Sequence, residues 1–176
     1  MICRLKKILP GFLPLLIILS GCQGVDDNRI PNMPVNISLA GAGLWNTFGV
    51  SGFGSHRNFI YNPLGVSQPS NFAFPGNSAT GFGGVLLIEG VDPFSAITAA
   101  PLAYDLACPV ERNPQIRVEV ENETYMAVCK ECNSVYDVTV ANGAPISGEA
   151  ATGKYKYALK SYRVIPSPSG GYLITN

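Results

Sequence analysis

The sequence predicts an all-β protein, and three observations lead to this prediction. Nineteen glycines and fourteen prolines in 176 residues would interrupt most helical periods. Apolar residues come in short runs or alternate with polar ones, as they do in strands that bury one face. Asn142-Gly143 is a strong hairpin-turn signal close behind one such stretch. We therefore expect one β domain with enough residues to bury its own core.

The first 21 residues are typical of a secretion signal. A basic start is followed by an apolar run over residues 8–19 that is too short to span a bilayer with ease. The run ends in Leu19-Ser20-Gly21-Cys22, which resembles a bacterial lipobox, where cleavage precedes the cysteine and the cysteine is acylated. We expect residues 1–21 to be removed and Cys22 to carry the lipid. An uncleaved membrane anchor and an ordinary secretion signal are the alternatives.

Lipid on Cys22 predicts a location in the bacterial cell envelope. More than one acyl chain, such as palmitate, would anchor the protein stably, whereas a single chain binds only marginally. Gln23 is compatible with sorting to the outer membrane, on its periplasmic or its surface face. Residues 22–34 are polar and contain prolines, so we expect a flexible tether between the membrane and a domain over residues 35–176.

The charge balance argues against one class of partner. Arg4, Lys6 and Lys7 lie in the removed segment and are three of the twelve basic residues, so nine remain against twelve acidic residues. No basic patch emerges in the mature sequence, and we expect no nucleic-acid partner. Cysteines outside the cytoplasm are free to form disulfides where the habitat is oxidising.

The apolar pattern predicts the strands of the domain. In chain order they cover residues 35–39, 84–89, 102–108, 115–121, 124–129, 134–140, 157–165 and 172–175. Asn122-Glu123 predicts one hairpin turn, and residues 166–171 predict the turn of a terminal hairpin. Residues 40–83 are rich in glycine and aromatic residues, and we expect them to form loops packed over a sheet. Residues 92–101 are a predicted loop with one helical turn at 94–99, and no other helix is expected.

Three of the five cysteines lie in two short loops. The first loop reads Cys108-Pro-Val110, at the end of a predicted strand. The second loop reads Cys129-Lys-Glu-Cys132. We expect these loops to point their thiols at one another, so any chemistry of this chain is expected here.

From about residue 84 to residue 176 the chain resembles a Rieske domain, an antiparallel β fold that normally carries a 2Fe–2S cluster. One family loop reads Cys-x-His, and the other reads Cys-x-x-His followed by Gly-Ser-x-Phe/Tyr-Asp. The matching segments here are Cys108-Pro-Val110, Cys129-Lys-Glu-Cys132, Asn133-Ser-Val-Tyr-Asp137, Gly143-Ala-Pro-Ile-Ser-Gly148 and Leu159-Lys-Ser-Tyr162-Arg-Val164. The resemblance implies stacked antiparallel sheets with an inserted subdomain that presents the two loops.

The departures from the family fall on the cluster ligands. A Rieske cluster holds one iron by two thiolates and the other by two imidazoles. Val110 and Cys132 stand at the two histidine positions, and valine has no lone pair to offer. The single histidine, His56, lies far outside the motif. A standard cluster therefore cannot form, and we expect no cofactor. Asn133 also replaces a family glycine, which is expected to alter the loop backbone.

Several arrangements of the three thiols are open. The two family cysteines share one iron, so the resemblance implies that Cys108 and Cys129 lie within disulfide reach, and this pairing would stabilise the fold by roughly 3 kcal/mol. Cys129–Cys132 and Cys108–Cys132 are the other pairings. A disulfide or buried thiols without metal is the leading expectation. The alternative is an atypical 2Fe–2S cluster or another metal site on all three thiols, including a zinc site completed by His56.

We expect a lipid-anchored, Rieske-like protein that has lost cluster chemistry and acts as a binding or structural module, not as an enzyme. The sequence has one histidine, no Ser-His-Asp set, no phosphate-binding loop and no dinucleotide fingerprint. A thiol oxidoreductase would need a helix at the Cys-x-x-Cys motif, where a strand is predicted instead. The partner, a protein or a small molecule, is not specified. Electron transfer through an atypical metal site at Cys108, Cys129 and Cys132 is the alternative function.

Overall fold

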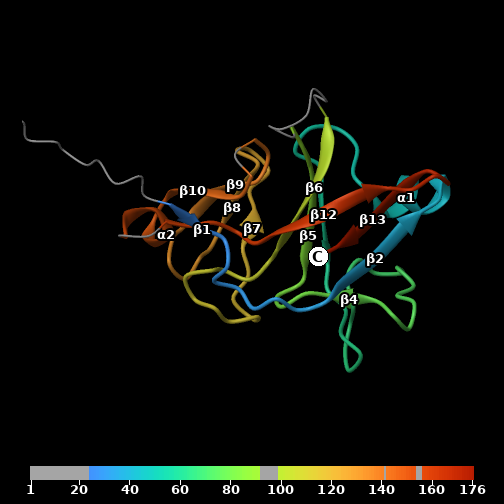
Figure 1. Ribbon diagram of the computed structural model, residues 1–176, viewed down its shortest axis with the longest axis horizontal. Helices are drawn as coiled ribbons and strands as arrows, with labels where there is room; N and C mark the ends of the chain where they lie inside the picture. Colours follow the sequence, from blue (N-terminus) through green and yellow to red (C-terminus); the bar gives the residue numbers. More distant parts are fainter. Residues whose placement is uncertain (1–23, 92–98, 141, 154–155) are drawn as a thin grey trace, which may run out of the picture.

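The computed structural model describes residues 24–91, 99–140, 142–153 and 156–176 and confirms the all-β class (Figure 1). The strands are β1 (Val25–Asp26), β2 (Val35–Ala40), β3 (His56–Phe59), β4 (Ala79–Thr80), β5 (Val85–Gly90), β6 (Ala100–Asp105), β7 (Glu119–Val120), β8 (Met126–Val128), β9 (Val135–Asp137), β10 (Ala144–Ser147), β11 (Lys156–Tyr157), β12 (Ser161–Pro166) and β13 (Gly171–Thr175). The helices are α1 (Ala42–Phe48) and α2 (Glu149–Thr152). No helix within the described ranges is long and apolar enough to cross a membrane.

The larger sheet has seven strands in the order β3-β5-β6-β12-β13-β2-β4, and neighbouring strands run antiparallel. The sheet is curled into a nearly closed barrel. Its two edges approach each other just after β3, where the Tyr61 backbone N–H donates to Thr80 Oγ1 of β4 at 3.3 Å. The curled sheet encloses one hydrophobic core, to which Ile37, Phe59 and Ile174 contribute fully buried side chains.

Strand β5 is buried on both faces, which explains its continuous apolar sequence. Val85 and Leu87 belong to the core of the larger sheet. Leu86 and Ile88 point the other way, into a second core on the outer face. The buried strand predicted at residues 84–89 is therefore confirmed.

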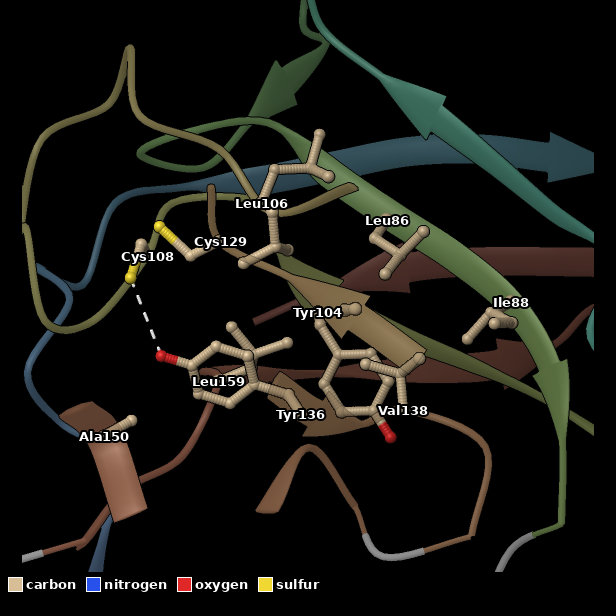
Figure 2. Close-up of a cluster of buried hydrophobic side chains, with 12 residues drawn as sticks. Leu86, Ile88, Tyr104, Leu106, Cys108, Cys129, Tyr136, Val138, Ala150 and Leu159 are labelled. Carbon is tan, nitrogen blue, oxygen red and sulfur yellow. Dashed lines mark hydrogen bonds between the residues drawn. The ribbon is translucent and has the colours of Figure 1, made fainter. Parts of the chain in front are cut away.

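The smaller sheet has four antiparallel strands in the order β10-β9-β8-β7 and is inserted in the chain between β6 and β12 of the larger sheet. Tyr136 and Val138 from this part of the chain share the second core with Leu86 of β5 (Figure 2). The expected arrangement, two stacked antiparallel sheets with an inserted subdomain, is present.

The predicted hairpins form, although several strands are shorter than predicted. Strand β7 pairs with β8 across the turn predicted at Asn122-Glu123, and β12 pairs with β13. Asn142 and Gly143 lie between β9 and β10 with φ angles of 51° and 74°, so both adopt the left-handed conformation typical of Asn-Gly turns. The connection runs from Asp137 to Ala144 and is longer than a two-residue hairpin turn. Only two residues of the predicted strand 115–121 are in β7, because the preceding residues turn within the first cysteine loop.

The expectation of no helix besides the turn at 94–99 is wrong, because α1 lies within residues 40–83 and α2 follows β10. Helix α1 is the longer of the two. This helix is seven residues long, is flanked by glycines and buries no residue completely. The ring of its Trp45 packs against Tyr172 of β13, with 4.6 Å between the ring centroids. So short a helix has no repeated apolar face that a sequence pattern could reveal. The helical turn predicted at 94–99 falls almost entirely outside the described residues.

The segment over residues 25–30 contacts the domain, which differs from the flexible tether expected over residues 22–34. Strand β1 forms a parallel pair with β11. The guanidinium of Arg29 lies 4.0 Å from the centroid of the Tyr157 ring, and Ile30 is 2% exposed. These contacts join segments that are far apart in the chain, so composition alone does not indicate them.

A buried carboxylate at the end of β6 connects several parts of the fold. The Asp105 side chain accepts hydrogen bonds from the backbone N–H groups of Phe82, Gly83 and Ala107 at 2.9, 3.0 and 2.7 Å. It also accepts a bond from the Tyr162 hydroxyl at 2.6 Å. Burial and the charge of Asp105 raise the pKa of Tyr162, so this hydroxyl stays protonated as a donor. The four bonds tie the turn before β5, strand β12 and the start of the first cysteine loop to one point.

Replacement of Asp105 by alanine is expected to lower the free energy of unfolding by on the order of 3 kcal/mol or more, because four buried donors lose their acceptor. Tyr162→Phe removes one of the four bonds, and its expected cost is about 1 to 2 kcal/mol. Urea denaturation followed by circular dichroism measures both effects. An Asp105→Ala chain as stable as the native chain would contradict this role.

Candidate metal centre

Two loops position the cysteines of the centre. Cys108 follows β6, and its backbone N–H donates to the Ile116 carbonyl at 3.0 Å, while its carbonyl accepts from the Arg112 N–H at 2.9 Å. Cys129 follows β8, and its N–H donates to the Ser134 carbonyl at 2.9 Å. Each loop is thus held around its cysteine by backbone bonds, so its shape does not depend on a bond between the sulfur atoms.

The loops bring three sulfur atoms together. The Sγ atoms of Cys108, Cys129 and Cys132 all lie within 4.8 Å of one another, and the distance from Cys108 Sγ to Cys132 Sγ is 3.5 Å. An ion with metal–sulfur bonds near 2.3 Å holds tetrahedral sulfur ligands about 3.8 Å apart. The observed spacing therefore fits three ligands of one ion after small shifts of the side chains.

The disulfide predicted between Cys108 and Cys129 is not formed in this structure, where all three cysteines are free thiols. A disulfide requires a sulfur–sulfur distance of about 2.05 Å. Cys132 Sγ lies within the same 4.8 Å limit of both other sulfur atoms and is 3.5 Å from Cys108 Sγ. The spacing does not single out one pairing, and the disulfide stays a prediction.

The surroundings of the centre are mainly apolar. Cys108 and Cys129 are fully buried, whereas Cys132 is half-buried and lies on the more open side. Val110 and Ile116 pack against the buried cluster that contains Cys108 and Cys129. Val110, at the first family histidine position, therefore contributes packing and no ligand atom.

Two hydroxyl groups contact the sulfur atoms. The Tyr136 hydroxyl lies 3.6 Å from Cys108 Sγ, and Figure 2 shows it pointing from the second core toward this sulfur. The Cys132 thiol donates to Ser134 Oγ at 3.1 Å, and the same oxygen accepts from the Ala150 N–H at 2.9 Å. The contact of the Tyr136 hydroxyl was not predicted from the sequence. The place of Tyr136 in the family's Ser-x-Tyr-Asp run was the available signal.

Burial controls the protonation of the thiols. It raises the pKa of Cys108 from 9.0 to about 12, and it also raises the pKa of Cys129. Backbone N–H groups oppose this effect: those of Val110 and Glu111 lower the pKa of Cys108, and the second loop acts in the same way on Cys129. Both thiols are therefore protonated at neutral pH without a cation. The same N–H groups are placed to stabilise thiolates once a cation replaces the protons.

The second loop contains a left-handed residue at the position where the family has glycine. Asn133 has a φ angle of 53°. Asparagine tolerates this region better than most residues, so the exchange expected to alter the backbone leaves a left-handed turn in place. Gly148 packs directly on this turn, where a Cβ atom would lie 2.1 Å from the Asn133 carbonyl oxygen.

His56 does not reach the centre. It lies in β3 opposite Ile88, and Ile88 pairs in turn with Leu102 of β6. Leu102 is six residues before Cys108, which corresponds to roughly 20 Å of extended chain. Among the described residues the only group of close metal-ligating side chains is the three cysteines. The zinc site completed by His56 is therefore wrong.

No protein-family model matches this chain, and no match is found among curated proteins or solved structures. These comparisons do not identify a Rieske protein. The likeness to that family rests on the motif residues of the sequence. Cys22, the predicted lipid site, lies outside the described residues.

The stability of the reduced, metal-free chain is expected to fall as the pH rises from about 9 to 12. Between these values the unfolded chain loses the Cys108 proton while the folded chain keeps it, so the unfolded state is favoured increasingly. Below pH 9 this contribution is constant. Urea denaturation at several pH values, with a metal chelator present, measures the slope.

Cys108→Ala is the matched control for this slope. Its stability is expected to change less between pH 9 and pH 10 than that of the native chain. Equal slopes for the two chains would show that burial of the Cys108 thiol does not set this pH dependence.

Proposed function

We propose that the chain is a lipid-anchored, Rieske-like protein of the bacterial cell envelope that binds one thiophilic metal ion through Cys108, Cys129 and Cys132. The observation that carries this proposal is the approach of three thiols, from two loops, to within 4.8 Å of one another. Thiolates are the ligands that select Cu(I) and Zn(II) over hard cations. In this role the domain is a binding module and has no catalytic group of its own.

The same spacing argues against a 2Fe–2S cluster. In a Rieske cluster two ligands serve one iron and two serve the other. Ligands of different irons are separated by the width of the cluster, so they lie farther apart than ligands of a single ion. Cys132, at a position of the second iron, is only 3.5 Å from Cys108, and Val110 offers no donor atom. The geometry supports a mononuclear site better than electron transfer through an atypical cluster.

Lipid on Cys22 would hold the metal centre close to the membrane. Three residue steps separate Cys22 from Val25, a reach of at most about 11 Å. Strand β1, which begins at Val25, pairs with β11, and Arg29 Nε donates to the Pro109 carbonyl at 3.2 Å, next to Cys108. A domain anchored in this way would be restrained near the lipid surface, where a partner in the same membrane could reach it.

Metal binding can be tested on the full chain, purified in detergent and reduced without oxygen. After addition of Zn(II) or Cu(I), native mass spectrometry is expected to show one ion per chain. Cys129→Ser is expected to weaken binding by more than the roughly 100-fold that removal of an outer hydrogen-bond partner costs.

Cys22→Ala is the matched control, because it removes a cysteine outside the centre and is expected to bind metal like the native chain. A reduced native chain that binds neither ion would contradict the proposed function. Two irons with two sulfides per chain would replace it with cluster binding.

The anchor is tested separately by phase partitioning of cell extracts in a cloud-point detergent. The native chain is expected in the detergent phase and Cys22→Ala in the aqueous phase, because the acyl chains are attached through the Cys22 thiol. A Cys22→Ala chain that still enters the detergent phase would contradict lipid attachment at this residue.

A further inference from the structure

We infer that the thiol centre is a three-coordinate site for a soft monovalent cation, Cu(I), and is poorly matched to Zn(II). This inference rests on the proposed function and adds the identity of the ion. The sulfur spacing alone suits both ions, because bonds near 2.3 Å place sulfur atoms about 3.8 Å apart in a tetrahedron and about 4.0 Å apart in a triangle. The choice between the ions therefore depends on the number of donor atoms.

The centre has three donors within the described part of the chain. The group of close ligating side chains contains Cys108, Cys129 and Cys132, with no histidine or carboxylate among them. Zinc in structural sites is almost always held by four protein ligands. Val110 stands where the Rieske motif has its first histidine. It is half-buried and packs against the hydrophobic cluster.

The two nearby hydroxyl groups are unsuitable as a fourth ligand. The Tyr136 hydroxyl lies 3.6 Å from Cys108 Sγ and is directed at this sulfur atom. Ser134 Oγ already accepts hydrogen bonds from the Cys132 thiol and the Ala150 N–H. Both oxygens are therefore already engaged with a sulfur atom, and they orient the sulfur atoms around the ion.

On the side of the two buried cysteines the surroundings also disfavour a water molecule as the fourth ligand of zinc. A bound water needs two to four polar partners. Ile116, Val118 and Ala127 belong to or pack against the cluster around the two buried cysteines and offer side chains without polar atoms. Cu(I) is soft, is selected by thiolates and needs neither water nor a fourth protein ligand.

The charge balance is the main cost of such a site. Each thiol that binds the ion releases its proton to solvent, so Cu(I) on three thiolates leaves a net charge of −2, whereas Zn(II) would leave −1. Backbone N–H groups of both loops are directed at the sulfur atoms of Cys108 and Cys129. Arg29, bonded to the Pro109 carbonyl, adds a positive charge beside the first loop. These groups offset part of the excess negative charge.

Substitution of Val110 tests the donor count directly. Val110→Cys places a side chain of similar size but with a thiol two residues after Cys108, in the loop that packs against the cluster around the buried cysteines. It is expected to raise the affinity for Zn(II) by more than about tenfold, because a fourth thiolate completes the tetrahedron. The same substitution is expected to change the affinity for Cu(I) by a smaller factor than the affinity for Zn(II). Val110→Ala, which adds no donor, is the control.

The measurement uses the full chain in detergent without oxygen, with chromogenic chelators competing for Zn(II) and for Cu(I). Thermal unfolding of the metal-free variants shows whether each is folded. Val110→His, with an imidazole at the same position, is the second variant and is expected to shift the preference toward Zn(II) in the same direction.

The outcomes separate this inference from the proposed function. A native chain that holds Zn(II) as tightly as folded Val110→Cys or Val110→His overturns the three-coordinate site but leaves a metal-binding protein. A native chain that binds neither ion overturns both. Tight Cu(I) binding with a selective gain of Zn(II) affinity in the Val110 variants is the expected result.

Discussion

The buried Asp105 carboxylate is the interaction on which the thiol centre most depends. It joins the turn before β5, the hydroxyl of Tyr162 and the backbone of Ala107, the residue immediately before Cys108. A buried charge is tolerated only when its hydrogen bonds are satisfied, and four donors meet that requirement here. The first cysteine loop therefore leaves the larger sheet from a fixed point. The smaller sheet brings the second loop to it, with Tyr136 packed between the sheets.

Much of the fold was predictable because its signals are local. The buried run of β5 and the turn at Asn142-Gly143 depend on neighbouring residues, and the structure confirms both. Helix α1 was missed because it is short and has no buried face. The docking of residues 25–30 was missed for a different reason: Arg29 contacts Tyr157 and Pro109, which are distant in the chain.

At the candidate site, too, local features were predictable and features that depend on long-range packing were not. The three cysteines were predicted as a group from their two loops, and the exclusion of a standard cluster followed from Val110 and Cys132. The spacing of the sulfur atoms depends on how the two sheets pack, and no local pattern encodes it. For that reason the sequence left a disulfide and buried thiols without metal open, and the structure shows free thiols within 4.8 Å of one another. His56 was a wrong fourth ligand, since only the register of β3 shows its distance from the centre.

The most direct test of this account is X-ray absorption spectroscopy at the metal edge of the full chain loaded with one equivalent of Cu(I). The predicted result is a first shell of three sulfur atoms, without a second metal nearby and without nitrogen or oxygen neighbours. A shell that contains nitrogen or oxygen ligands, or a short metal–metal distance, would contradict a mononuclear centre built from Cys108, Cys129 and Cys132.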